Sequence, residues 1–292
     1  MAVSCWLRVG RLGLLAGTIA LYSASAEAAP VAVRQANGLS SAAIPANTVE
    51  RLRSGDPARV QSALDDVRIA GRGGEVSAKV IVSLLRQGMS VSLTQAAIET
   101  LGETGSASAG DVLSSYARHR HVSIRKASVQ ALARTGGPVA IRALKLALSD
   151  PDPSVRGVAA TGLGALKAHE ATPELLAALD HGVSEASASV GLLCAGSECD
   201  KLAYKLGRIP LPVVMSGLER MLLRPTSEVG DDAKLAIVAR IRDLGTSGAH
   251  DFFVGLQKGW PKGGSPRVLQ AIDQAALVTS ASPGRQPFGG GK

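Results

Sequence analysis

The chain has 292 residues and a formal net charge of +8, and 46% of its residues are hydrophobic while only 3% are aromatic. This apolar fraction is enough for a real core, and the abundance of Ala and Leu favours helices whose backbones approach closely. With few aromatic rings to stack on bases and no long basic run, we expect no specific binding of nucleic acid.

The N-terminal segment has the order of features that is typical of a secretory signal peptide. Arg8 and Arg11 precede a short apolar run, and the small residues Ala24-Ser25-Ala26 follow it. We predict a signal peptide over residues 1–26, cut after Ala26 or Ala28. A membrane anchor is the alternative, but the apolar run is about 11–14 residues long and a bilayer needs about 20. We therefore expect an exported protein, periplasmic or extracellular, with no transmembrane segment once the signal is removed.

Residues 27–47 are rich in Ala, Ser and Pro and show no sustained period, which indicates a flexible linker. A repeat region is predicted over residues 48–262. It begins with a degenerate unit around Asp56-Pro57, as expected of an end unit whose outer face meets water.

The repeat region matches itself at a shift of 31 residues. The aligned positions are apolar: Leu101, Leu132 and Leu163 form one row, and Val82, Leu113, Leu144 and Leu175 form another. A period of this size is typical of stacked helix-turn-helix units, because no unit can bury its apolar face without a neighbour. We expect the leucine row to be buried.

Three regular helix pairs are predicted from this register. They cover residues 76–87 with 91–103, 109–117 with 122–134, and 139–149 with 153–167. Asp152 is expected to cap the last of these helices, with Pro153 at its first position. Ser90 and His121 occupy the positions equivalent to Asp152.

After Lys167 the register loosens, although helical segments continue. They are predicted at residues 173–180, 184–194, 201–208, 212–224, 231–244 and 249–257. A C-terminal helix is expected within residues 263–279, and the Gly- and Pro-rich residues 280–292 are predicted to be a disordered tail.

Two cysteines, Cys194 and Cys199, remain after the predicted cleavage. In an oxidising compartment they can form a disulfide across the short segment between them. Two free, buried thiols are the alternative, and a zinc site would need two more ligands at ordered spacing. We favour the disulfide and expect no metal site.

Two segments carry a family resemblance. They are Asp150-Pro-Asp-Pro-Ser-Val-Arg156, followed by Gly162-Leu163-Gly164, and Val122-Ser-Ile-Arg-Lys-Ala-Ser-Val-Gln-Ala-Leu132. Both resemble the short HEAT-like repeats of bacterial proteins, of the PBS-lyase type. The resemblance implies an all-α fold, a right-handed α-solenoid of antiparallel helix pairs.

The same resemblance implies that Asp and Arg side chains link successive units. Arg125 fits this role, and so does Arg156 with Asp150 or Asp152. The first regular unit has Thr94 at the equivalent position, so we expect the series of links to be incomplete.

Some proteins with similar repeats are enzymes, but their site residues are not matched. Deoxyhypusine hydroxylase holds two irons through several His-Glu pairs, whereas this chain has only His169-Glu170, expected in an exposed loop. His119 and His121 flank Arg120 and are interpreted as a solvated turn, with a metal or anion contact as the alternative. No nucleophile elbow, P-loop or dinucleotide-binding glycine pattern occurs. We therefore expect no catalytic residues, no cofactor and no enzyme activity.

A candidate binding surface follows from the repeat register. Lys126, Gln130 and Arg134 lie away from the apolar stripe of their helix, and equivalent positions in neighbouring helices extend them into exposed rows. We predict that these three residues contribute to a partner-binding face. An ordinary solvated face is the alternative, in which Glu103 pairs with Arg134 across units.

These features predict a non-catalytic scaffold or adaptor that binds another protein in the bacterial cell envelope. Two alternatives stay open: an accessory or remnant enzyme of the HEAT-like lyase or hydroxylase type, and a binder of anionic polymers through the basic excess. No motif in the sequence identifies the partner or the oligomeric state.

Overall fold

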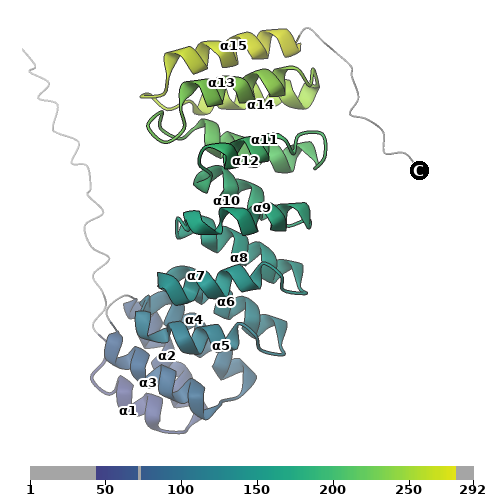
Figure 1. The fold of residues 1–292 in the computed structure, drawn as a ribbon. Helices are drawn as coiled ribbons and strands as arrows, with labels where there is room; N and C mark the ends of the chain where they lie inside the picture. Colours follow the sequence, from purple (N-terminus) through teal and green to yellow (C-terminus); the bar gives the residue numbers. More distant parts are fainter. Residues whose placement is uncertain (1–43, 72–73, 281–292) are drawn as a thin grey trace, which may run out of the picture. The chain divides into compact units, whose positions relative to one another are not determined.

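The computed structural model of the chain describes residues 44–71 and 74–280 (Figure 1). The predicted signal peptide, residues 27–43 of the predicted linker and the predicted tail beyond Ser280 lie outside the described residues. Within them the secondary structure is helical, with fifteen α-helices, two short 3-10 helices and one isolated bridge between Leu206 and Ile209 in place of any strand.

The helices form pairs that stack in chain order (Figure 1). The first helices of the pairs are α1 (Thr48–Arg53), α3 (Glu75–Gln87), α5 (Gly110–Tyr116), α7 (Gly137–Ala147), α9 (Thr172–Asp180) and α11 (Ser197–Ala203). The second helices are α2 (Pro57–Ala70), α4 (Val91–Thr104), α6 (Val122–Thr135), α8 (Pro153–Ala165), α10 (Glu185–Leu193) and α12 (Leu211–Leu222). The 3-10 helices η1 (Ala107–Ala109) and η2 (His169–Ala171) precede α5 and α9.

Three further helices follow the pairs: α13 (Asp231–Arg242), α14 (Ser247–Gly259) and α15 (Pro266–Ser280). Each second helix packs against the next one, from α2 through α12, and α15 packs against both α13 and α14. The described residues therefore form an α-solenoid of antiparallel helix pairs, as the sequence resemblance implied.

The core of the stack is built from the repeated apolar positions. Leu101, Leu132 and Leu163 are each 0% exposed, so the burial predicted for this row is confirmed. The row is continuous because each leucine sits on a second helix, and these helices pack directly on one another. Burial of equivalent side chains in successive units is what stabilises a repeat array.

Helix α8 begins as the sequence predicts. The Asp152 side chain accepts a hydrogen bond from the backbone N–H of Ser154 at 2.9 Å, and Pro153 is the first helical residue. Ser90 likewise accepts from the N–H of Leu93, at 3.5 Å. His121 makes no such bond at the start of α6, and its ring stacks on His119 with the two ring centroids 5.3 Å apart.

Two glycines let the second helices α10 and α12 approach closely. Neither Gly191 nor Gly217 has a side chain, and the two helices touch through their backbones at this point. A Cβ atom added at Gly191 would overlap the carbonyl group of Gly217. This contact replaces the interlocking side chains that separate helices in most packed pairs.

One predicted helix is misplaced. The sequence predicts a helix over residues 201–208, but the structure has α11 earlier, at Ser197–Ala203. The Glu198 carboxylate accepts a hydrogen bond from the Ala195 N–H at 3.2 Å, which stabilises the start of the helix. The helix ends at Ala203 with Tyr204 as its C-cap, and the chain then turns at Gly207, whose φ of 79° suits glycine.

A buried lysine closes the C-terminal end of α12. Lys234 of α13 is only 2% exposed, and its Nζ donates a hydrogen bond to the backbone carbonyl of Arg224. Burial lowers the pKa of the Lys234 ammonium, and the nearby Asp231 carboxylate opposes that shift. The ammonium also lies 6.0 Å from the centre of the Trp260 ring. A cation at a helix C-terminus satisfies carbonyl groups that have no helical partner.

Candidate partner-binding groove

A groove of about 550 Å³ runs between helices α6 and α8 and reaches α10. Its wall on α6 includes Lys126, Gln130 and Arg134, and Glu185 of α10 borders it on the other side. The structure therefore brings the three residues predicted to bind a partner to the edge of one groove. Their role in binding stays a prediction.

Small residues on α8 make the floor of this groove. At the positions equivalent to Lys126, Gln130 and Arg134, helix α8 carries Gly157, Thr161 and Ala165. The sequence predicts a row of exposed side chains across these units, but the structure has a wall on α6 and a hollow over α8. The difference arises because α6 carries long side chains at the three repeat positions where α8 carries short ones.

The groove is bordered by charges of both signs. Arg134 pairs with Glu103 of α4, with Nη1 and Oε1 2.5 Å apart, as the repeat register indicates. Lys126 is half-buried, and within the described residues it has no hydrogen-bond or ion-pair partner. Glu185 lies close over Gly157, where a Cβ atom would come within 2.8 Å of its carboxyl group. A partner thus meets a free ammonium on one side of the groove and a carboxylate on the other.

Comparison with known protein families decides what these repeats are. A model for HEAT repeats matches residues 78–148, and a model for the PBS lyase HEAT-like repeat matches residues 155–181. These two segments of the chain therefore carry HEAT-like repeats. No curated protein shows significant sequence similarity to it.

Several solved structures are similar to the HEAT-like chain. The complex of CpcE and CpcF of phycocyanin lyase from Nostoc sp. PCC7120 gives 18% identity, covers 78% of this chain and 93% of the matched chain, and has a TM-score of 0.43. One engineered protein gives 18% identity over 81% of this chain and 68% of its own, with a TM-score of 0.42. A second gives 19% identity over 81% and 96%, with a TM-score of 0.38.

The HEAT-like units are linked by an Arg–Asp pair at one place. The Arg125 guanidinium donates to both oxygens of the Asp150 carboxylate, with distances of 2.8 and 2.9 Å. Arg156 is not linked to a carboxylate as expected, because its Nη1 donates to the backbone carbonyls of Asp150 and Pro151. The next unit has His181 at the position of Asp150, so it offers Arg156 no carboxylate at that position.

The two cysteines lie at the junction of α10 and α11. They form a disulfide in the structure, with Cα atoms 5.1 Å apart, and Cys194 and Cys199 are 0% and 4% exposed. The Nη1 of Arg224 also donates to the carbonyl of Cys194 at 2.7 Å. This junction is therefore held by a covalent bond and a charged hydrogen bond together.

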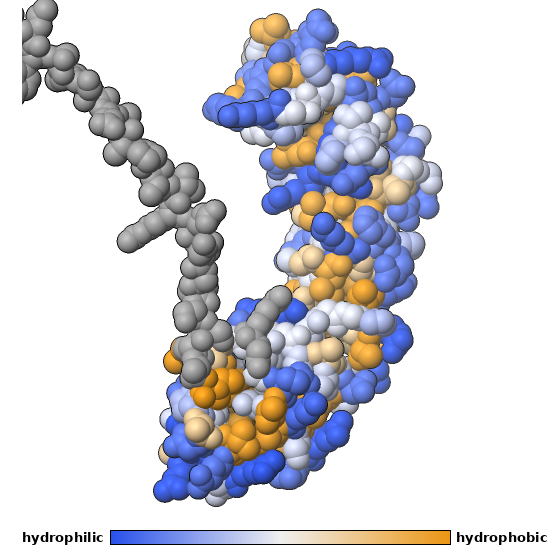
Figure 2. Space-filling view, turned by 90° about the vertical axis from the view of Figure 1, so that its left-hand side faces the viewer, coloured by the Kyte–Doolittle hydropathy of each residue, from blue (hydrophilic) through white to orange (hydrophobic). Residues whose placement is uncertain are grey.

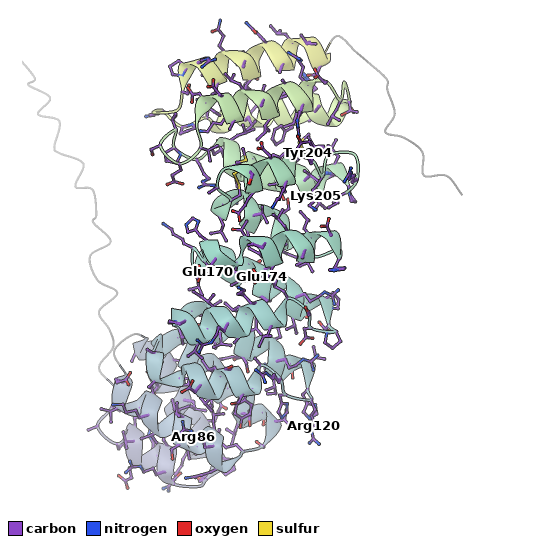
Figure 3. All side chains as sticks on the ribbon, in the orientation of Figure 1. Arg86, Arg120, Glu170, Glu174, Tyr204 and Lys205 are labelled. Carbon is purple, nitrogen blue, oxygen red and sulfur yellow. A yellow bond between two sulfur atoms is a disulfide. The ribbon has the colours of Figure 1, made fainter. Side chains whose placement is uncertain are left out.

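His169 and Glu170 are both exposed, as the sequence predicts, and they lie in the 3-10 helix η2 that follows α8. Nδ1 of His169 lies 2.9 Å from the carbonyl oxygen of Leu193, so it can donate a hydrogen bond to the C-terminal end of α10. Glu170 is exposed (Figure 3). Among the described residues, no group of three or more His, Cys, Asp or Glu side chains lies close enough to hold a metal ion. None of the helices described in the structure is both long and apolar enough to cross a bilayer.

Proposed function

We propose that this protein is a non-catalytic scaffold in the bacterial cell envelope, and that it binds another protein through the groove between α6, α8 and α10. The observation that carries the proposal is the pairing of an open, small-residue floor with a free ammonium group. Thr161 and Ala165 are exposed on the floor and leave room for side chains of a partner, the Glu185 carboxylate covers Gly157, and Lys126 supplies a charge that no described residue neutralises.

The surface around the stack supports binding of a protein and not burial in lipid. Figure 2 shows apolar atoms exposed as an interrupted band between polar ones. Leu192 near the end of α10 is 41% exposed, and Ala165 at the end of α8 is exposed as well. Interfaces between proteins that associate reversibly have this mixed character.

The location in the envelope rests on two features. The segment over residues 1–26 has the pattern of a secretory signal, and the Cys194–Cys199 disulfide is of a kind that persists in oxidising compartments. Fractionation of cells with N-terminal sequencing tests this part of the proposal. Recovery of the chain in the cytoplasm with residues 1–26 intact would contradict it.

The binding role is tested by reversing the charge at the groove. We expect Lys126→Glu, alone or with Arg134→Glu, to lose crosslinks between the native protein and its partner, identified by mass spectrometry in intact cells. Lys258→Glu is the matched control, because Lys258 is exposed on α14 and has no charged partner among the described residues. Circular dichroism shows whether each variant keeps its helices. An unchanged set of crosslinks in a folded Lys126→Glu variant would rule the groove out as the binding surface.

A further inference from the structure

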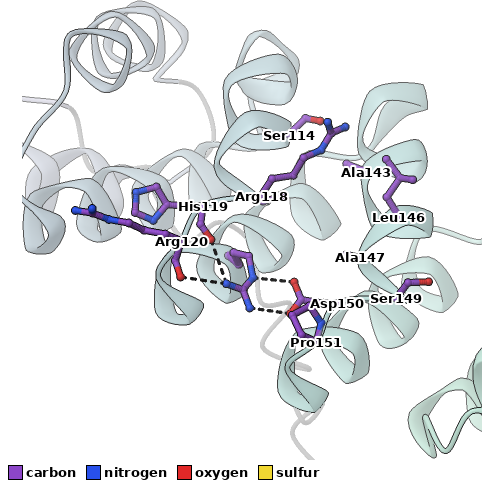
Figure 4. Close-up of a pocket in the computed structure, with 12 residues that line it drawn as sticks. Ser114, Arg118, His119, Arg120, Ala143, Leu146, Ala147, Ser149, Asp150 and Pro151 are labelled. Carbon is purple, nitrogen blue, oxygen red and sulfur yellow. Dashed lines mark hydrogen bonds and ion pairs between the residues drawn. The ribbon is translucent and has the colours of Figure 1, made fainter.

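A second cavity, of about 620 Å³, lies between the α5–α6 turn and the α7–α8 turn (Figure 4). Arg120, in the α5–α6 turn, lies on the opposite side of the stack from Glu170, which precedes α9 (Figure 3). The lining combines Arg118, Arg120 and Arg125 with apolar side chains that include Leu146. None of these residues lines the groove described above.

The cavity carries an excess of positive charge. Asp150 is the carboxylate in its lining, and both of its oxygens accept hydrogen bonds from Arg125. Arg118 and Arg120 are exposed, and within the described residues their guanidinium groups have no partner. Figure 4 shows Arg118 extending toward Ser114 of α5, while Arg120 lies beside His119. Two guanidinium groups are thus left without a counter-charge.

An exposed leucine stands beside these cations. Leu146 of α7 is 62% exposed, although the adjoining Ala143 and Ala147 are buried. Equivalent positions in the neighbouring units hold Ser115 and Ala177, so stacking of the units does not require a large apolar side chain there. Covering Leu146 with another apolar group would remove its side chain from water, which is favourable.

The turn that presents the arginines is held in place by its neighbours. The rings of Tyr116, His119 and His121 stack in series, with centroids 5.9 and 5.3 Å apart. The Tyr116 hydroxyl donates to the Leu85 carbonyl of the preceding unit at 2.7 Å, and Arg125 donates to the His119 carbonyl at 3.1 Å. A turn fixed before the ligand arrives loses less conformational entropy on binding.

We infer that this cavity binds an acidic, hydrophobic peptide segment of a partner protein, with a carboxylate at Arg118 and an apolar side chain over Leu146. Arginine binds carboxylates strongly because its planar guanidinium can donate two parallel hydrogen bonds. An anionic polymer such as polyphosphate would meet the same guanidinium groups, but it has no apolar group to cover Leu146. Arg120 adds to the positive potential at the rim, which attracts an acidic segment from solution.

Fluorescence polarisation of a labelled synthetic peptide tests this site. The probe is a peptide in which Glu-Leu pairs alternate with Gly-Ser pairs, and a Gln-Leu version is its neutral counterpart. Each peptide is added to the purified native protein. We expect the Glu-Leu peptide to bind, and the Gln-Leu peptide to bind on the order of tenfold more weakly or worse. Arg118→Gln should weaken binding of the Glu-Leu peptide to a similar degree. Leu146→Ser should weaken it by about tenfold through lost apolar burial.

The controls separate this site from its alternatives. Lys258→Gln removes one exposed charge far along the chain, outside both the cavity and the groove, and should leave the affinity for the Glu-Leu peptide unchanged. Absence of binding by the native chain, or equal binding by a folded Arg118→Gln variant, would overturn the inference. So would full competition by inorganic polyphosphate together with no effect of Leu146→Ser, since that result would assign the cavity to anionic polymers.

Discussion

The central repeats and the later repeats hold their neighbours by different means. In the centre, Arg125 on α6 reaches across to the Asp150 carboxylate of the next unit. Further along, Gly191 and Gly217 bring the backbones of α10 and α12 into contact, and the Cys194–Cys199 disulfide ties α10 to α11. The later repeats thus stay packed although their sequence no longer follows the 31-residue register. Backbone contact and a covalent bond hold them where a side-chain ion pair holds the central repeats.

The largest loss of stability is expected from a substitution at the contact between the backbones of α10 and α12. In Gly191→Ala the new methyl group would overlap the Gly217 carbonyl, which cannot move aside as a flexible side chain can. We expect the free energy of unfolding to fall by about 4 kcal/mol or more, at the upper end of overpacking effects. Chemical denaturation followed by circular dichroism measures it.

Gly255→Ala is the matched control for this substitution. Gly255 lies inside α14 with nothing within 4 Å of an added Cβ, so the same change should stabilise the protein by about 0.5–1 kcal/mol through helix propensity. Equal stability of Gly191→Ala and the native chain would show that α10 and α12 are not in backbone contact.

A smaller effect is expected from the disulfide of the same region. Replacing both Cys194 and Cys199 with Ala should lower the free energy of unfolding by about 2 kcal/mol, because the closed loop is short. A reductant should destabilise the native protein by a similar amount and leave the double variant unchanged. Titration of free thiols in the native protein gives an independent answer, and reaction of both Cys194 and Cys199 in the denatured, unreduced chain, located by mass spectrometry, would contradict the disulfide.

The smallest effect is expected in the central region and depends on pH. Burial lowers the pKa of His119 from its ordinary 6.5, and the positive charges of His121, Arg120 and Arg125 lower it further. The unfolded chain therefore takes up this proton at a higher pH than the folded chain, so stability falls as the pH drops from 6.5 through the lower folded pKa. Thermal unfolding measured across this pH range should show a smaller fall in stability for His119→Asn than for the native protein.

His181→Asn is the comparison for this pH effect. His181 is exposed on the α9–α10 turn, one repeat beyond Asp150, so this variant controls for the loss of an exposed histidine. If both variants gave the native slope, the burial of His119 would not be felt by the folded state.

The architecture could be predicted because the repeat register is written directly in the sequence. Leu132 aligns with Leu101 and Leu163, and equivalent positions on stacked helices are buried alike. The cap at Asp152 could also be predicted, since it depends only on residues within the same turn. Helix α11 could not be placed correctly from the repeat register, because its start depends on a local hydrogen bond that the Glu198 side chain accepts from the Ala195 N–H.

The sites were harder to predict than the fold. The register identified Lys126, Gln130 and Arg134 as equivalent outward positions, yet the groove exists because Gly157 and its neighbours on α8 are small. The sequence does contain a signal for the groove, because short residues on α8 align with long residues on α6 in the 31-residue register. The second cavity depends on Arg125 being neutralised while Arg118 is not, and that distinction requires knowing where each guanidinium points.

The contact between α10 and α12 has a mechanical consequence. A stack of helices bends when the side chains between neighbouring helices slide past or compress one another. At Gly191 and Gly217 no side chain separates the backbones of α10 and α12. The Cys194–Cys199 disulfide lies at the adjoining turn. We therefore expect the contact between α10 and α12 to resist bending. Bending of the stack should occur instead at the contacts between the neighbouring helix pairs on either side.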